Sequence, residues 1–181
     1  MVNYLTVLFL GIYCACACSR GALAAQELEP GLVGEYFNIG EEITDFPSLE
    51  GKKVALKRVE KQVNYETTDE NFYGTDLKDQ FAIRFTGLIR VPKDAKYKFF
   101  TNSDDGSRLF IDGKQVVDNG GLHGMEEKEG EIDLKAGDHE IKIEFFQNGG
   151  GAGIKASWEA EGIPKEIISD KVFFHFKGTE K

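Results

Sequence analysis

The stretch from Phe81 to Val91 alternates apolar and polar side chains, and the chain after Pro30 carries no long period typical of a helix. The apolar set is Phe81, Ile83, Phe85, Ile89 and Val91, and the polar set is Arg84, Thr86 and Arg90. Side chains two residues apart lie on the same face of a strand, so this pattern predicts a strand with one buried face. Such strands are typical of antiparallel sheets that cover a core on one side.

Turn signals separate several further short apolar runs. Asp112-Gly113 lies between two β-prone runs, and this dipeptide favours a hairpin because a type I′ turn needs positive φ at both central residues. The other expected strands cover residues 96–101, 108–111, 114–117, 139–146, 154–158 and 172–176, with a less regular one near 54–59. Many short strands with frequent turns predict an all-β fold, an antiparallel sandwich or barrel.

Residues 1–24 are typical of a secretory signal peptide. An apolar run from Tyr4 to Cys18 precedes a small-residue stretch, and the run is shorter than the roughly 18 to 20 residues of a membrane span. We expect cleavage near Ala24, which removes all three cysteines and leaves residues 25–181 as one β domain with a core at about 31–176. The protein is then secreted, periplasmic or at the cell surface, with no stable membrane span. The alternatives are an uncleaved anchor and a lipid anchor at Cys18.

The charge balance and the motifs exclude several functions. With 22 Lys and Arg against 31 Asp and Glu, the net charge is −9, which disfavours a broad nucleic-acid-binding surface. No serine-hydrolase or zinc-protease motif occurs, so we expect no catalytic residue and no enzyme. His139 and His175 are expected to be structural or exposed, whereas His123 lies in a predicted loop and could contact a ligand. The charged cluster at 126–129 is predicted to be a solvated loop.

Two adjacent carboxylates, Asp104 and Asp105, follow the predicted strand at 96–101. A solvated turn is one interpretation, because neighbouring side chains diverge in an ordinary trans chain. The other is a cation site, which requires a cis peptide between them. Calcium suits such a pair, since it accepts six to eight oxygen ligands with loose geometry.

A glycine-rich stretch from Gln147 to Gly153 could supply the remaining ligands. Glycines let backbone carbonyls turn inward without a Cβ clash. The side-chain oxygen of Gln147 or of Asn148 could add an amide ligand. The competing interpretation is a flexible connection between strands. A dinucleotide site is excluded because no helix follows, and an EF-hand is excluded because Gly113 stands where its last Glu belongs.

Several motifs in order resemble the protective-antigen-type (PA-14) domain family. They are the opening 31–37, the strand 81–87 with its continuation through 99, the segment 103–113, the turn 134–139, and the glycine loop with Trp158. The similarity covers about 31–176 and implies an antiparallel β-sandwich or barrel. In lectin members of this family, an Asp-Asp pair joined by a cis peptide and an amide-bearing loop hold calcium, which binds vicinal sugar hydroxyls.

The resemblance implies a calcium-dependent carbohydrate-binding module with cell-surface or extracellular partners. By residue, it implies Asp104 and Asp105 as carboxylate ligands of calcium and of the glycan, and Gln147 or Asn148 as the amide ligand, with Gln147 also facing the glycan. Backbone carbonyls of the loop, those of Gly149 and Gly151 among them, would complete the shell. Other members are assembly or spacer modules, so a non-catalytic protein-interaction or cell-envelope scaffold module without metal or sugar is the alternative. A hydrolase accessory or remnant is a third class.

Overall fold

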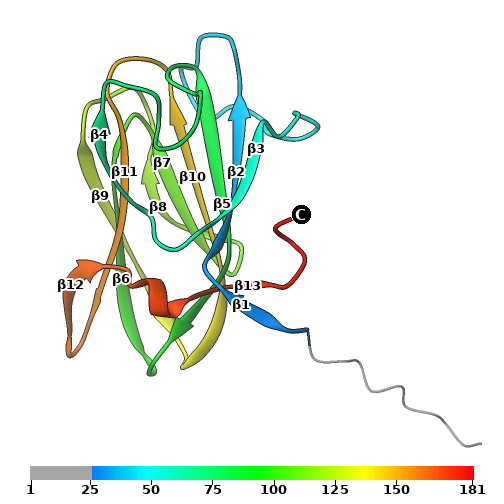
Figure 1. Ribbon diagram of the computed structural model, residues 1–181. Coiled ribbons are helices and arrows are strands. Elements are labelled where there is room, and N and C mark those ends of the chain that lie inside the picture. The colour runs from blue at the N-terminus through cyan, green and yellow to red at the C-terminus, as the bar shows by residue number, and fades with distance from the viewer. Residues whose placement is uncertain (1–25) are drawn as a thin grey trace, which may run out of the picture.

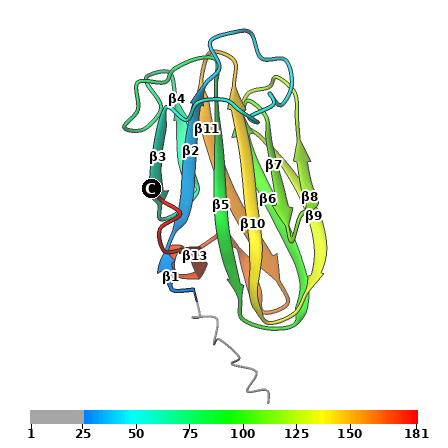
Figure 2. The ribbon, with the colours of Figure 1, turned by 90° about the vertical axis from the view of Figure 1, so that its right-hand side faces the viewer.

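The structure is a computed structural model that describes residues 26–181, so the predicted signal peptide and Cys18 lie outside the described residues. Within this range the chain is all-β, as predicted, with thirteen strands and a single short 3-10 turn. All strand pairs are antiparallel, and they form two sheets. Figures 1 and 2 show the two sheets packed face to face. No helix among residues 26–181 has the length and apolar character needed to cross a membrane.

The larger sheet has eight strands and the smaller has five. The larger one contains β1 (Leu28–Pro30), β2 (Leu32–Asn38), β3 (Leu56–Glu60), β5 (Phe81–Val91), β7 (Ser107–Ile111), β8 (Lys114–Asn119), β10 (Gly137–Gln147) and β13 (Phe173–Phe176). The smaller one contains β4 (Asn64–Thr68), β6 (Ala95–Asp104), β9 (Glu126–Leu134), β11 (Ala152–Ala160) and β12 (Ile163–Ile167). The 3-10 turn η1 (Asp170–Val172) precedes β13.

The core lies between the sheets and is rich in aromatic side chains. The five apolar residues predicted to share a face of β5 are all at most 2% exposed, whereas Arg90 on the other face is exposed. Trp158 on β11 packs against Tyr97 and Phe99 of the neighbouring β6. The alternation in the sequence therefore identified the core face of the central strand correctly.

The hairpin predicted at Asp112-Gly113 joins β7 to β8. Asp112 has φ of 49° and Gly113 has φ of 76°, both in the left-handed region that a type I′ turn requires. The turn is further fixed because the Asp112 carboxylate accepts the backbone N–H of Glu140 over 2.9 Å.

Five details of the strand prediction differ from the structure. The cluster at 126–129 is not a loop but the start of β9, an edge strand of the smaller sheet whose charged side chains stay solvated. Backbone pairing with β6 decides this, and charge is a common feature of edge strands. The strand near 54–59 is shifted to β3, and β4 was not expected because its sequence shows no alternation. Val172 belongs to η1, and Gly153 lies in β11 rather than in the glycine loop.

Five connections gather at one end of the sandwich. Figure 1 shows the β2–β3, β4–β5 and β10–β11 connections at the top, and the antiparallel order places the β6–β7 and β8–β9 connections at the same end. The adjacent carboxylates of Asp104 and Asp105 and the glycine turn, residues 148–151 between β10 and β11, are far apart in sequence. They are thereby brought to the same end of the sandwich.

Candidate functional site

Asp104 and Asp105 lie between β6 and β7 and are joined by a cis peptide bond, as the resemblance implies. Asp105 is only 6% exposed. Its Oδ1 accepts the backbone N–H of His123 over 3.1 Å, and its Oδ2 accepts that of Asn148 over 2.8 Å. One carboxylate thus connects the β8–β9 loop and the β10–β11 turn to the end of β6. Each oxygen keeps a lone pair for another partner.

The carboxylate of Asp104 differs from that of Asp105 in its contacts. Within residues 26–181 it takes part in no hydrogen bond or ion pair, and the residue is half-buried. Burial raises the pKa of Asp104, and the neighbouring charges of Asp105 and Asp69 act in the same direction, while His123 opposes them. The site therefore holds more negative charge than the described residues neutralise. A bound cation would offset it.

The glycine turn lies directly against this carboxylate. A Cβ placed on Gly151 would lie 3.0 Å from Oδ2 of Asp104, 2.8 Å from Oγ1 of Thr67 and 3.6 Å from Oδ1 of Asp69. Only a residue without a side chain fits in this cradle of oxygen atoms. Gly149 is different, because the nearest atom to its Cβ would be Oδ1 of Asp79 at 3.8 Å.

The two candidate amides have separate structural roles. Gln147 is fully buried, and its Oε1 accepts the backbone N–H of Asp105 over 3.0 Å, whereas its Nε2 has no hydrogen-bond partner within the described part of the chain. The Oδ1 of Asn148 accepts the backbone N–H of Ile43 over 2.9 Å. Both amide oxygens thus hold backbone near the carboxylates, and each has a second lone pair.

Buried polar side chains stabilise the β6–β7 connection from the interior of the sandwich. The hydroxyls of Ser103 and Ser107 lie 2.6 Å apart, and the amide of Asn119 donates to Ser103 over 3.1 Å and to the carbonyl of Glu126 over 2.8 Å. All three side chains are at most 1% exposed. These three residues hold the ends of β6, β7 and β8 together, so the hydroxyls of Ser103 and Ser107 have a structural role.

The β2–β3 loop covers one side of the site. The ring of Phe46 packs edge-on against Phe146 at 5.0 Å, and the Arg108 guanidinium lies 4.2 Å from the Phe46 ring centroid. Phe146 in turn fills the space beside Gly106, where a Cβ would approach it to 2.4 Å. The loop is therefore packed onto the site by aromatic contacts.

The structure brings together the predicted residues Asp104, Asp105, Gln147 and Asn148, with Gly151 beside them. His123 joins them through its backbone, while its ring lies 2.9 Å from the carbonyl of Gly124 and 3.3 Å from that of Asn119, the last residue of β8. Thr67 and Asp69 were missed, because β4 gave no sequence signal. The oxygen donors of this end suit a hard cation such as calcium.

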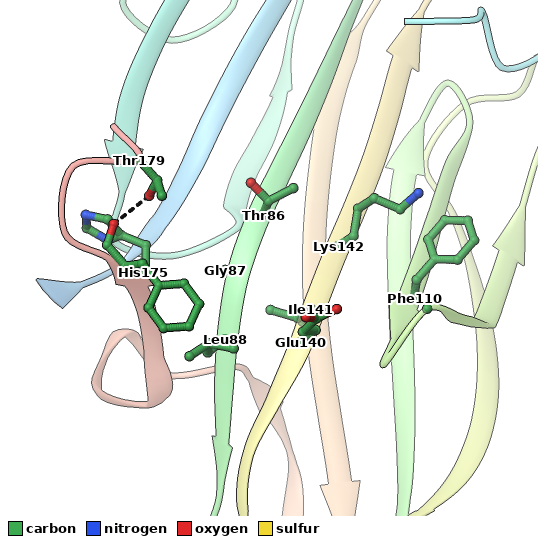
Figure 3. A pocket seen from close by; sticks show the side chains of 11 residues that line it. Thr86, Gly87, Leu88, Phe110, Glu140, Ile141, Lys142, His175 and Thr179 are labelled. Carbon is green, nitrogen blue, oxygen red and sulfur yellow. Dashed lines mark hydrogen bonds between the residues drawn. The ribbon is translucent and has the colours of Figure 1, made fainter. Parts of the chain in front are cut away.

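A groove of about 330 Å³ lies elsewhere, on the outer face of the larger sheet. Figure 3 shows it between β5, β10 and β7, with Leu88, Lys142 and Phe110 along it and His175 and Thr179 at one edge. It includes no residue of the loop site, so it is a separate feature of the surface.

Known proteins resemble this chain in sequence and in fold. Residues 28–171 match the family described as PA14 domain. Anti-sigma-I factor RsgI3 of Acetivibrio thermocellus is 31% identical over 159 residues, which cover 86% of this chain and 23% of the relative. The chain thus spans about a quarter of that curated relative.

Two solved structures have similar folds. An anti-sigma factor domain-containing protein from Clostridium clariflavum is 25% identical with a TM-score of 0.69, covering 84% of this chain and 49% of the other. The PA14 sugar-binding domain from an RTX adhesin is 19% identical with a TM-score of 0.70, covering 81% of this chain and 98% of the other. With the matched range spanning most of its length, the chain belongs to the PA14 domain family.

Proposed function

We propose that this chain is a calcium-dependent carbohydrate-binding module that acts outside the cytoplasm, without catalysis of its own. The observation that carries the proposal is the unpaired carboxylate of Asp104. It is half-buried beside a second carboxylate and lies against a glycine whose Cβ position is surrounded by oxygen atoms. Two carboxylates without a cation there would repel each other in a partly dehydrated site.

The proposed ligands come from two connections. Asp104 and Asp105 would supply carboxylate oxygens, the β10–β11 turn would supply the carbonyls of Gly149 and Gly151, and Gln147 or Asn148 would supply an amide oxygen. Such a set is rich in oxygen and mixed in charge, as calcium sites are. Thr67 and Asp69 lie close enough to the Gly151 cradle to take part directly or through water.

Bound calcium would offer its open coordination positions to two neighbouring hydroxyls of a sugar. The residues of the chain fix where that sugar lies. Asp105 holds the β8–β9 loop in place through the N–H of His123. The adjacent Leu122 is 49% exposed and would present an apolar surface to the ring carbons. The cation would therefore provide affinity, and the loops would select the sugar.

The comparison with the RTX adhesin domain supports a glycan partner, because that protein is described as sugar-binding and shares the fold. The apolar run near the start of the sequence supports export, with a lipid anchor at Cys18 as the second way of holding the domain outside the cytoplasm. Activity on glycans by this chain would instead favour the class of hydrolase accessories or remnants.

Titration calorimetry tests the proposal. We expect chelator-treated protein to bind one calcium ion per chain and to bind a sugar from a glycan panel only when calcium is present. Asp104→Asn should weaken calcium binding by more than about 10-fold and sugar binding with it, whereas Asp133→Asn, which removes an exposed charge on β9, should change neither. No calcium binding, or equal affinity in Asp104→Asn protein, would contradict the proposal.

A protein-interaction module is the second candidate. The 31% identity to an anti-sigma-I factor favours it, since that relative is named for a regulatory protein contact. Under this alternative the chain binds a protein partner and glycans have no effect. Calorimetry with a purified sigma-I factor checks it: binding that calcium and sugars leave unchanged would support this function over the first.

A further inference from the structure

A second group of potential metal ligands lies away from the loop site, at the edge of the larger sheet where β1 pairs with β13. Glu29 and His175 are direct partners across these two strands, and Glu180 follows shortly after β13. One ligand atom from each of the three side chains lies within 4.8 Å of the other two. None of the three belongs to the loop site.

His175 is the central observation. Its side chain is only 3% exposed, and its Nε2 has no hydrogen-bond partner within residues 26–181. That nitrogen lies 3.8 Å from Oε2 of Glu29 and 3.8 Å from Oε2 of Glu180, too far for a hydrogen bond to either. A buried polar atom without a partner is uncommon in folded proteins, and this one is aimed between two carboxylates.

The other ring nitrogen determines which atom is available. The Nδ1 of His175 lies 3.1 Å from the carbonyl oxygen of Gly31. A carbonyl only accepts, so Nδ1 carries the proton, and in the neutral imidazole Nε2 then has the lone pair. Histidines that bind metals commonly donate their other N–H to a backbone carbonyl in this way, which fixes the ring.

The Glu180 side chain is held in place by hydrogen bonds of the segment after β13, residues 177–181, called the tail below. The backbone N–H of Lys177 donates to the carbonyl of Glu27 over 2.9 Å, and Thr179 caps the carbonyl of Phe176 through its hydroxyl over 2.7 Å. The N–H of Gly178 donates to Oε2 of Glu180 over 2.7 Å. The tail therefore presents the Glu180 carboxylate to His175 instead of leaving it in solvent.

We propose that Glu29, His175 and Glu180 form a binding site for a divalent transition cation, with Zn²⁺ as the representative ion. One imidazole and two carboxylates are ligands that zinc accepts, and three protein ligands leave one position for water. In a tetrahedral zinc site with bonds of about 2.0 Å, ligand atoms lie roughly 3.3 Å apart. Small rotations of the two glutamates, both partly exposed, would close the present 3.8 Å separations.

The nearby cation Lys177 does not occupy this position. Its Nζ pairs with Oε2 of Glu27 at 2.8 Å and lies 3.7 Å from Oε1 of Glu29, whereas the oxygen of Glu29 near His175 is Oε2. An ion at the site would join the first and last described strands to the tail. It would also fix the edge of the groove at which His175 and Thr179 lie (Figure 3).

Zinc titration of the full chain, purified without a polyhistidine tag, tests the proposal. We expect one Zn²⁺ per chain, with affinity reduced roughly ten-fold or more in Glu29→Gln and in Glu180→Gln protein. These surface variants keep the fold because both side chains are partly exposed. Two variants are matched controls. Glu27→Gln removes a neighbouring carboxylate that pairs with Lys177, and His139→Gln removes another histidine that pairs with a carboxylate. Asp104→Asn should also leave zinc binding unchanged, which separates this site from the proposed calcium site.

Nitrogen-15 NMR of the histidine rings gives a second measurement. We expect added Zn²⁺ to shift Nε2 of His175 while Nδ1 keeps its proton, and calcium to leave both unchanged. The proposal is overturned if zinc leaves the His175 signals unaltered, if the ring titrates only as a protonated partner of the two glutamates, or if the control variants lose zinc equally.

Discussion

The backbone N–H of Asp105 donates a 3.0 Å hydrogen bond to Oε1 of Gln147, the last residue of β10. Gln147 is fully buried, so the turn between β6 and β7 is fixed from the interior of the sandwich. The carboxylate of Asp105 in turn holds two loops through backbone N–H groups. The proposed site is therefore rigid at Asp105 and open at Asp104, where a ligand would bind.

We expect Asp104→Asn to weaken calcium binding by more than about 10-fold, because loss of a direct ligand exceeds the usual effect of losing a supporting group. The same change should raise the melting temperature of calcium-free protein near neutral pH. It removes a charge that burial and Asp105 disfavour. Calorimetry and thermal unfolding in chelator measure the two effects. A lower melting temperature would contradict the second expectation.

The raised pKa of Asp104 also predicts a pH dependence. The folded state binds this proton more tightly than the unfolded state, so the contribution of Asp104 to stability is complete below its unfolded pKa, near 3.8, and is lost as pH rises through the folded pKa. Calcium should restore stability above that range. Comparing unfolding curves of the native chain and of Asp104→Asn protein against pH isolates this contribution, and parallel curves would count against it.

Gly151→Ala should weaken calcium binding by roughly ten-fold or more without unfolding the protein. The added Cβ would lie 2.8 Å from Oγ1 of Thr67 and 3.0 Å from Oδ2 of Asp104, so the carboxylate has to move. Gly124→Ala is the matched control, because its Cβ would meet nothing within 4 Å and the residue is not a proposed ligand. Equal calcium affinities for the two variants would show that the cradle has no role.

Leu122→Ser should weaken sugar binding about five-fold and leave calcium binding unchanged. Loss of apolar contact worth about 1 kcal/mol gives this factor. The side chain is 49% exposed and precedes His123, whose backbone N–H binds Asp105. Val59→Ser removes another exposed apolar side chain, on β3, and serves as the control. Calorimetry with each ligand separates the two affinities, and a change in calcium affinity would contradict the assignment of Leu122 to the sugar.

Glu60→Gln should lower the free energy of unfolding by about 2 to 3 kcal/mol, because it breaks a largely buried charged network. Glu60 is 7% exposed, accepts the hydroxyl of Tyr65 over 2.5 Å, and also bonds to the hydroxyl of Tyr36 and the guanidinium of Arg58. Urea unfolding measures the change. Glu131→Gln on the exposed edge of β9 should shift stability by no more than about 0.5 kcal/mol.

The sequence predicted the strand face and the hairpin correctly where neighbouring residues alone restrict the backbone conformation. Alternation along β5 identified the core face, because a strand has only two sides. Asp112-Gly113 identified a hairpin, because few residues tolerate two successive positive φ angles. The motif at 103–113 and the glycine turn indicated the candidate site because their order along the chain resembles that of a known family.

The tertiary structure decided what local sequence does not encode. Pairing with β6 made a strand of the charged cluster at 126–129, and pairing with β11 made a strand of residues 64–68. Thr67 and Asp69 reach the Gly151 cradle only through that pairing. In the same way, Glu29 and His175 are 146 positions apart and meet because β1 pairs with β13. Sequence alone determined the fold class, because it follows from local pattern, and it indicated Asp104 and Asp105 through resemblance to a known family. Backbone pairing between distant strands decided which other side chains surround each site, because such pairing is not encoded locally.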